Sequence, residues 1–194
     1  MKIKEIFYSL QGEGSMTGRP AIFVRFSGCN LACPFCDTDF KGGETYTEDE
    51  LIEAIEKTAP CKFIVFTGGE PTLQLTESLI QKLHKKAYYL AMETNGTREY
   101  TKGLDWITVS PKNDFCANVT LYPNKALASE VKVGYNGVND PEKYANCGVL
   151  KYVQPCDTGD PAKNKIIVDK CVEWLKAHPK WRLSLQTHKI IGVL

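Results

Sequence analysis

Three cysteines lie close together in the first fifth of the chain, and their spacing is the strongest chemical pattern in the sequence. They are Cys29, Cys33 and Cys36, in the arrangement C-x3-C-x2-C. A [4Fe–4S] cluster normally takes four thiolates, so a loop that offers three leaves one iron open to a small molecule. Catalytic zinc sites keep a ligand position open in a comparable way. The spacing therefore favours an iron–sulfur site with one vacant iron.

Two other uses of these thiols remain open from spacing alone. A structural zinc site normally shows paired C-x2-C units or nearby histidines, whereas His84, His178 and His188 are distant in sequence and could approach only in space. Disulfides are less favoured, because the N-terminus does not resemble a signal peptide and such chains usually keep their thiols reduced. We expect the five remaining cysteines to be buried residues or free thiols. These are Cys61, Cys116, Cys147, Cys156 and Cys171.

Regular elements that could position this loop alternate along the chain. Apolar, β-rich runs predict strands over 1–9, 21–26, 62–66, 87–92, 104–109, 130–133, 149–153 and 181–185. A capping box, with Thr47 at the N-cap and Glu50 three residues on, opens a helix predicted over 47–59. A second helix is predicted through 79–83 to about 86, and a third over 161–178. This alternation predicts an α/β fold with a mainly parallel sheet. Because 194 residues fall short of a full eight-fold barrel, we expect one domain (1–194) forming a partial, open barrel of about six mainly parallel strands with outer helices.

Polar stretches follow most of these strands directly. Ligands of parallel α/β folds bind at the carboxyl ends of the strands, so the sequence predicts that these stretches meet at one rim. They are 11–13, 29–38, 67–70, 93–95, 110–112, 154–157 and 187–188.

Three of the positions suggest specific chemistry, each with a plainer alternative. Arg25 interrupts an apolar run, so it must be paired or face a polar cavity, where its guanidinium would suit a carboxylate; a surface arginine on an edge strand is the alternative. Residues 37–39, Asp-Thr-Asp, offer oxygens that suit Mg2+ or a solvated turn. In the turn 67–71, Glu70 could hold a cationic group such as an ammonium, or the segment could be an ordinary strand-to-helix turn.

Charge and hydropathy exclude several classes of partner. The chain has 24 basic and 23 acidic residues, so it has no basic excess for nucleic acid or for a polybasic membrane anchor. No apolar run approaches the roughly 18 to 20 residues that span a bilayer. We therefore expect a cytoplasmic protein that acts on a small molecule.

The cysteine motif, with the aromatic Phe35 directly before Cys36, resembles that of the radical S-adenosylmethionine enzymes. The resemblance implies that the open iron binds the amino and carboxylate groups of S-adenosylmethionine, whose reductive cleavage gives a 5′-deoxyadenosyl radical. It also implies an external one-electron reductant such as flavodoxin or ferredoxin. An activase that installs a glycyl radical on a partner protein is the rival interpretation within the family.

A closer resemblance covers essentially the whole chain and concerns one branch of that family. It is carried by residues 9–14 (Ser-Leu-Gln-Gly-Glu-Gly), Arg25, 36–38, 67–71, 93–96, 110–112, 154–155 and 186–189 (Gln-Thr-His-Lys). The branch contracts 6-carboxy-5,6,7,8-tetrahydropterin to 7-carboxy-7-deazaguanine, with loss of ammonia and help from Mg2+, on the route to queuosine. Its members are homodimers.

The resemblance implies a role for individual residues, with no classical acid or base. Cys29, Cys33 and Cys36 would hold the cluster, and Thr38 would bind Mg2+. Substrate contacts would come from Leu10, Gln11, Gly12, Glu13, Arg25, Thr67, His188 and the terminal carboxylate of Leu194. Contacts to S-adenosylmethionine would come from Gly69, Ser110, Pro111, Lys112, Gln154, Pro155, Cys156 and Asp157. No role is carried over to residues 113–148.

Overall fold

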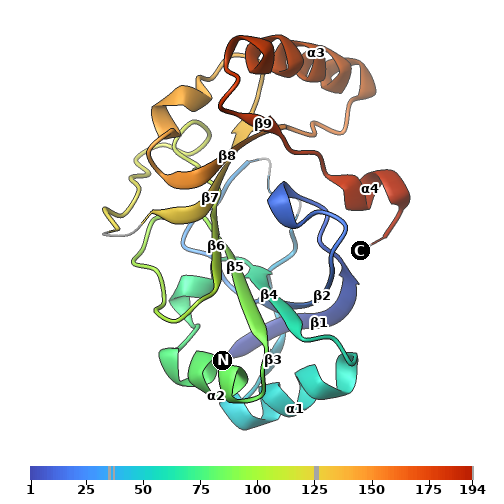
Figure 1. Cartoon of the computed structure of the whole chain (residues 1–194), viewed down its shortest axis with the longest axis vertical. Helices are drawn as coiled ribbons and strands as arrows, with labels where there is room; N and C mark the ends of the chain where they lie inside the picture. The colour runs from blue at the N-terminus through green and yellow to red at the C-terminus, as the bar shows by residue number, and fades with distance from the viewer. Residues whose placement is uncertain (35, 37, 125–126, 194) are drawn as a thin grey trace.

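A single curved sheet runs through the molecule and does not close into a barrel (Figure 1). The computed structural model describes residues 1–34, 36, 38–124 and 127–193. Within them the strand order is β3-β1-β2-β4-β5-β6-β7-β8-β9. The strands are β1 (Lys2–Leu10), β2 (Pro20–Phe26), β3 (Glu44–Thr45), β4 (Phe63–Gly68), β5 (Tyr89–Thr94), β6 (Trp106–Val109), β7 (Ala128–Tyr135), β8 (Gly148–Pro155) and β9 (Arg182–Leu183).

The sheet is mainly parallel, which confirms the predicted fold class. All neighbouring pairs from β2 to β9 are parallel, whereas β1 is antiparallel to both β2 and β3. The strands outnumber the expected six or so. The two-residue strand β3 is too short to leave a periodic pattern in the sequence, and β9 keeps two residues of the strand predicted over 181–185.

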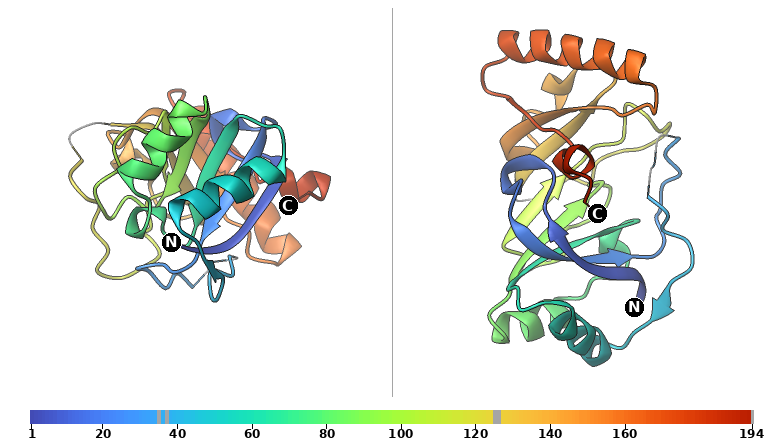
Figure 2. Two further views of the ribbon diagram at one scale, coloured as in Figure 1. Left: turned by 90° about the horizontal axis from the view of Figure 1, so that it is seen from below. Right: turned by 90° about the vertical axis from the view of Figure 1, so that its right-hand side faces the viewer.

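Helices cover the outside of the sheet at two ends of the molecule (Figure 2). They are α1 (Glu48–Thr58), α2 (Glu77–Lys85), α3 (Pro161–Ala177) and α4 (Thr187–Ile191), with short 3-10 turns η1 (Gly14–Met16), η2 (Pro71–Leu73) and η3 (Pro141–Tyr144). Apolar faces of α1 and α2 form one core with β2, β4 and β5. A second core joins α3 to β7 and β8. Burial of these faces supplies the main driving force for the arrangement.

Local signals explain where the helices begin and end. The predicted capping box at α1 is present: the Glu50 N–H donates to Thr47 Oγ1 (3.2 Å) and the Thr47 N–H donates to Glu50 Oε2 (2.8 Å). The segment after residue 186 forms the helix α4, which ends at Ile191 and is followed by Gly192 with φ 69°. Five residues are too few to leave a helical pattern in the sequence, so this helix was not predicted.

We propose that residues 1–194 form one domain, because strands from the beginning and the end of the chain enter the same sheet. Among the described residues, no helix is long and apolar enough to cross a membrane.

Candidate active site

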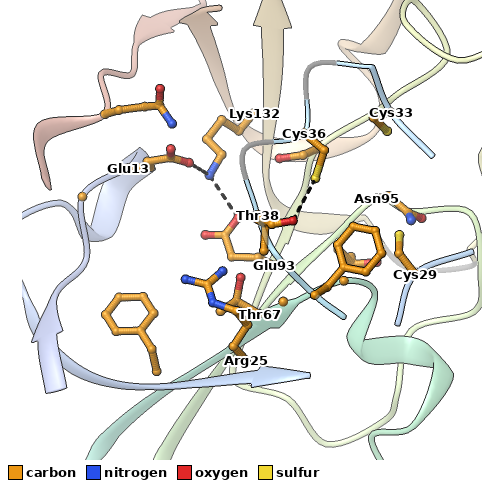
Figure 3. Close-up of a pocket in the computed structure, with 18 of the residues that line it drawn as sticks. Glu13, Arg25, Cys29, Cys33, Cys36, Thr38, Thr67, Glu93, Asn95 and Lys132 are labelled. Carbon is orange, nitrogen blue, oxygen red and sulfur yellow. Dashed lines mark hydrogen bonds and ion pairs between the residues drawn. The ribbon is translucent and has the colours of Figure 1, made fainter. Parts of the chain in front are cut away.

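A cavity of about 540 Å3 lies at the carboxyl ends of the parallel strands, within the size range of small-molecule sites. Figure 3 shows part of its lining. The predicted convergence of the polar stretches at one rim is confirmed. The predicted site residues that line the cavity are Leu10, Gln11, Gly12, Glu13, Arg25, Cys29, Cys33, Cys36, Thr38, Thr67, Gly69, Ser110, Lys112, Gln154, Pro155, Cys156, Asp157 and His188.

Among the described residues, two that were singled out from the sequence, Glu70 and Pro111, are not part of this lining. Pro111 is buried between Ser110 and Lys112. Phe35, Asp37 and Leu194, with its terminal carboxylate, lie outside the described residues.

The three thiols of the cysteine loop face the same cavity (Figure 3). The Leu31 N–H donates to Cys29 Sγ (3.4 Å), and Cys36 Sγ donates to the Thr38 carbonyl oxygen (3.8 Å). Within the described part of the chain, no three His, Cys, Asp or Glu side chains are close enough to hold a single metal ion. A cubane instead places each thiolate on a separate iron, so its ligands surround the cluster. The donor set fits that group.

A fourth cysteine approaches this loop from the segment after β6. The Sγ atoms of Cys116 and Cys33 are 3.1 Å apart. Cys116 carried no predicted role, because its spacing from the other thiols has no metal-ligand pattern.

Two glycines after β4 bring the backbone close to the cysteine loop. Gly68 has φ +119°, and a Cβ there would lie 2.3 Å from the Phe26 carbonyl oxygen. A Cβ on Gly69 would lie 1.8 Å from the Gly28 carbonyl oxygen. Only glycine permits both the positive φ and this close approach. The pair therefore packs the turn directly against the residue that precedes Cys29.

Glu70 is fully buried and uses its carboxylate within the protein. It accepts hydrogen bonds from Thr94 Oγ1 (2.7 Å), Asn95 N (2.8 Å) and Thr72 Oγ1 (2.6 Å). A buried carboxylate needs such internal donors. Glu70 therefore ties the end of β4 to the end of β5, and its role toward a cationic ligand stays a prediction.

Arg25 points into the cavity, not to the outer surface (Figure 3). Its Nε donates to Glu5 Oε1 at 2.6 Å, and its Cζ lies 5.6 Å from the centre of the Phe7 ring. Phe7 stacks on Phe23 with centroids 5.0 Å apart. The guanidinium is thus held at Nε, beside an apolar aromatic surface.

A buried charge network forms another wall of the cavity. Lys132 on β7 has a side chain that is 6% exposed, and its Nζ forms ion pairs with Glu13 and with Glu93, the latter at 3.0 Å. Gln154 Nε2 donates to Glu13 Oε1 (2.9 Å), and Gln11 Nε2 donates to Glu93 Oε1 (3.2 Å). Each carboxylate is therefore held at both oxygens.

The charges of this network follow from burial and pairing. Burial alone would raise the pKa of Glu13, but the Lys132 ammonium, with hydrogen bonds from Lys132, Gln154 and Gln186, lowers it to about 2. The pKa of Glu93 is raised, because burial and the nearby carboxylates outweigh Lys132. Burial disfavours the charged form of Lys132, yet the two carboxylates raise its pKa. Glu13 and Lys132 are thus both charged at neutral pH.

Glu5 and Lys132 line the cavity but were not singled out from the sequence, and Glu93 was expected at the rim without a specific role. Lys132 could have been found, because it is a charged residue inside the apolar segment Ala128–Tyr135. Like Arg25, a charged side chain in such a segment must be paired or face a polar cavity.

The C-terminal segment closes the cavity beside the loop after β1. The Thr187 N–H donates to the Gly12 carbonyl oxygen (2.9 Å), and a Cβ on Gly12 would lie 2.1 Å from Nδ1 of His188. Lys189 Nζ donates to Asp157 Oδ2 (3.1 Å), which ties the end of β8 to α4. Gly12 is therefore needed for the close approach of His188.

The open, mainly parallel sheet and the cavity with three thiols define the chain as a radical S-adenosylmethionine enzyme. Residues 23–113 match the model of the Radical SAM superfamily. Membership implies a [4Fe–4S] cluster and S-adenosylmethionine as cofactors.

Full-length similarity then narrows the assignment. The chain is 44% identical to the 7-carboxy-7-deazaguanine synthase of Bacteroides thetaiotaomicron, over 99% of this chain and 98% of that protein. It is 42% identical to that of Nitratidesulfovibrio vulgaris, with the same coverage. The crystal structure of QueE from Escherichia coli superposes with a TM-score of 0.76 at 28% identity, covering 96% of this chain and 94% of that one. The chain belongs to the 7-carboxy-7-deazaguanine synthase family.

Proposed function

We propose that this chain converts 6-carboxy-5,6,7,8-tetrahydropterin to 7-carboxy-7-deazaguanine, with ring contraction and loss of ammonia. The observation that carries the proposal is that one cavity combines three cluster thiols with groups suited to both ends of a pterin acid. Arg25 suits the carboxylate, and the Glu13 carboxylate suits the N–H groups of the amino-pyrimidinone edge. Family membership supports the same product.

When bound, the cluster and S-adenosylmethionine would supply a 5′-deoxyadenosyl radical suited to hydrogen abstraction at C6 of the pterin. The chain's own residues bind and orient. Cys29, Cys33 and Cys36 would hold the cluster. S-adenosylmethionine would lie against Gly69, Ser110, Pro111, Lys112 and residues 154–157. The pterin would lie against residues 10–13, Arg25, Thr67, His188 and the carboxylate of Leu194.

The stacked rings beside Arg25 support this placement of the substrate. The rings of Phe7 and Phe23 both line the cavity and offer apolar surface to a flat heterocycle. Because Glu5 holds Arg25 through Nε, the rest of the guanidinium can donate to a carboxylate without a large loss of side-chain entropy.

Thr38 is proposed as a protein ligand of Mg2+, because it lines the cavity beside the cysteine loop. Thr38→Ala should reduce the stimulation of turnover by Mg2+ by at least about tenfold, since even outer partners of metal sites contribute that much. Thr38→Ser, which keeps the hydroxyl, should retain the stimulation. Turnover is measured with and without added Mg2+. A metal response in Thr38→Ala equal to that of the unchanged protein would remove Thr38 as a ligand.

The surroundings of the enzyme are also part of the proposal. We infer that an external one-electron reductant, such as flavodoxin or ferredoxin, reduces the cluster, because cleavage of S-adenosylmethionine consumes an electron. We further propose a homodimer in the cytoplasm, without nucleic acid or membrane partners. The near balance of 24 basic and 23 acidic residues supports the last point.

The test of the function is a single anaerobic reaction. Reconstituted protein is incubated with the carboxypterin, reductant and S-adenosylmethionine, and the products are identified by mass. We expect to detect the deazaguanine acid and ammonia. Cleavage of S-adenosylmethionine without any deazaguanine acid would contradict the proposed substrate and would leave the glycyl radical activase as the better interpretation.

A further inference from the structure

Lys132 enters the cavity from a segment to which the family resemblance gave no role. Side chains alternate along a strand, so Lys132 shares its face of β7 with Gly134, which also lines the cavity. A buried ammonium is unfavourable unless it is paired. Its Nζ lies between the carboxylates of Glu13 and Glu93, so its environment is built for a charge.

We propose that Lys132 is a positioning residue whose ammonium group holds Glu13 as a fixed, ionised acceptor for the N–H groups of the pterin's amino-pyrimidinone edge. This inference rests on the proposed function and deepens it. Lys132 acts through Glu13 and is not assigned a contact with substrate.

The hydrogen bonds show how the orientation of Glu13 is fixed. One oxygen is paired with Lys132, and the other accepts from Gln154 Nε2. The Ser184 hydroxyl donates to Gln154 Oε1 at 2.7 Å, which orients that amide in turn. Gln186 also donates a hydrogen bond to Glu13. Because a carboxylate offers about four acceptor positions, Glu13 can still accept a donor from a ligand.

The charges show why a cation is required at this position. Glu13 and Glu93 both bind the same Nζ, and two carboxylates brought together without a cation share a proton. A protonated Glu13 would present an O–H donor toward the donors of the pterin edge, and such a mismatch leaves buried polar groups unpaired.

Other titratable groups near the network are accounted for by their own contacts. Glu130 on β7 accepts from the Ser15 N–H and from Thr108 Oγ1, both at 3.0 Å. His188 on α4 packs against Gly12, next to Glu13 in the chain. Neither Glu130 nor His188 takes part in the ion pairs of Lys132 described above. Among the described residues, Lys132 is therefore the direct counterion of Glu13.

The test measures the pH dependence of pterin binding to the reconstituted holoenzyme under anaerobic conditions. Lys132→Met keeps the length of the side chain and removes the charge. We expect binding at pH 7 to weaken by at least about tenfold. Loss of the cation raises the pKa of Glu13. As the solution is acidified, the affinity of the variant for the pterin should therefore begin to fall at a pH at least about one unit higher than in the unchanged protein. S-adenosylmethionine cleavage should persist.

A second variant separates positioning from simple loss of structure. Adding Glu93→Gln to Lys132→Met removes the second carboxylate, so the pH at which affinity falls should return toward that of the unchanged protein. Lys151→Met is the matched control, because Lys151 lies on the neighbouring strand β8, opposite Val131 and outside the cavity. It should bind pterin normally.

Lys132→Arg keeps the test decisive if Lys132→Met does not fold. Arginine retains the charge. The pH below which pterin affinity falls, called here the acid limit of binding, should therefore be the same in Lys132→Arg as in the unchanged protein, even if the affinity itself is reduced. A shifted limit in Lys132→Arg, or an unshifted limit in Lys132→Met, would overturn the inference. Failure of the unchanged protein to bind the pterin at all would instead refute the proposed function.

Discussion

Arg25→Ala is expected to weaken pterin binding by roughly 100-fold, while S-adenosylmethionine is still cleaved. Removing one partner of a buried charge pair costs about 2–5 kcal/mol, and about 1.4 kcal/mol corresponds to a factor of ten. Because Arg25 lines the cavity beside Phe7 and is not a thiol ligand, cluster content should not change. Binding is measured by anaerobic titration, and cleavage by the release of 5′-deoxyadenosine.

Two further variants make the Arg25 result specific. Arg25→Lys keeps the positive charge but loses the planar fork that binds a carboxylate through two hydrogen bonds, so it should recover only part of the affinity. Arg19→Ala is the matched control: Arg19 is also near β2, but its Cζ lies 4.1 Å from the centre of the Phe63 ring, and it does not line the cavity. Equal pterin affinity in Arg25→Ala would refute the placement of the substrate carboxylate.

Replacing any one of Cys29, Cys33 and Cys36 by alanine should abolish both the cluster and cleavage of S-adenosylmethionine. With only two thiolates left, the cubane lacks the ligands that hold it. Iron and sulfide are quantified after anaerobic reconstitution, and cleavage is assayed with excess reductant. Cys61→Ala is the control, because Cys61 lies outside the cavity and should retain full cluster content.

Cys116→Ala provides the sharpest check on the vacant iron. Cys116 Sγ lies 3.1 Å from Cys33 Sγ, near enough to raise the question of a fourth protein ligand. We expect the variant to keep its iron and to show the same change in cluster spectrum when S-adenosylmethionine is added. Loss of iron in this variant, with no spectral response in the unchanged protein, would mean that the fourth position is filled by the chain itself.

Local patterns were sufficient to predict the main elements and the location of the site. Apolar alternation indicated the strands, and the capping box indicated the start of α1 at Thr47. The convergence of seven polar stretches followed from one rule, since parallel strands end at the same edge of a sheet. Arg25 was found because a charge within a buried strand must have a polar environment.

The partners of the polar side chains could not be predicted in this way. Glu13 and Lys132 are 119 positions apart in the chain, and no local pattern records which distant residues face each other. Glu70 shows the same limit: its position after β4 did not reveal that Thr94 and Asn95, at the end of the next strand, donate to its carboxylate. The role of a carboxylate at the rim of the sheet depends on which hydrogen-bond donors the neighbouring strand ends bring to it.

The hydrogen bond from Thr187 to Gly12 has a consequence for how this cavity comes into being. It joins two segments separated by nearly the whole chain, and contacts between such distant segments form late in folding because a large loop must first be closed. The side of the cavity formed by the segments around Glu13 and His188 should therefore form only after the sheet has assembled. In native-state hydrogen exchange, we expect the Thr187 amide to exchange well before those of β4 and β5.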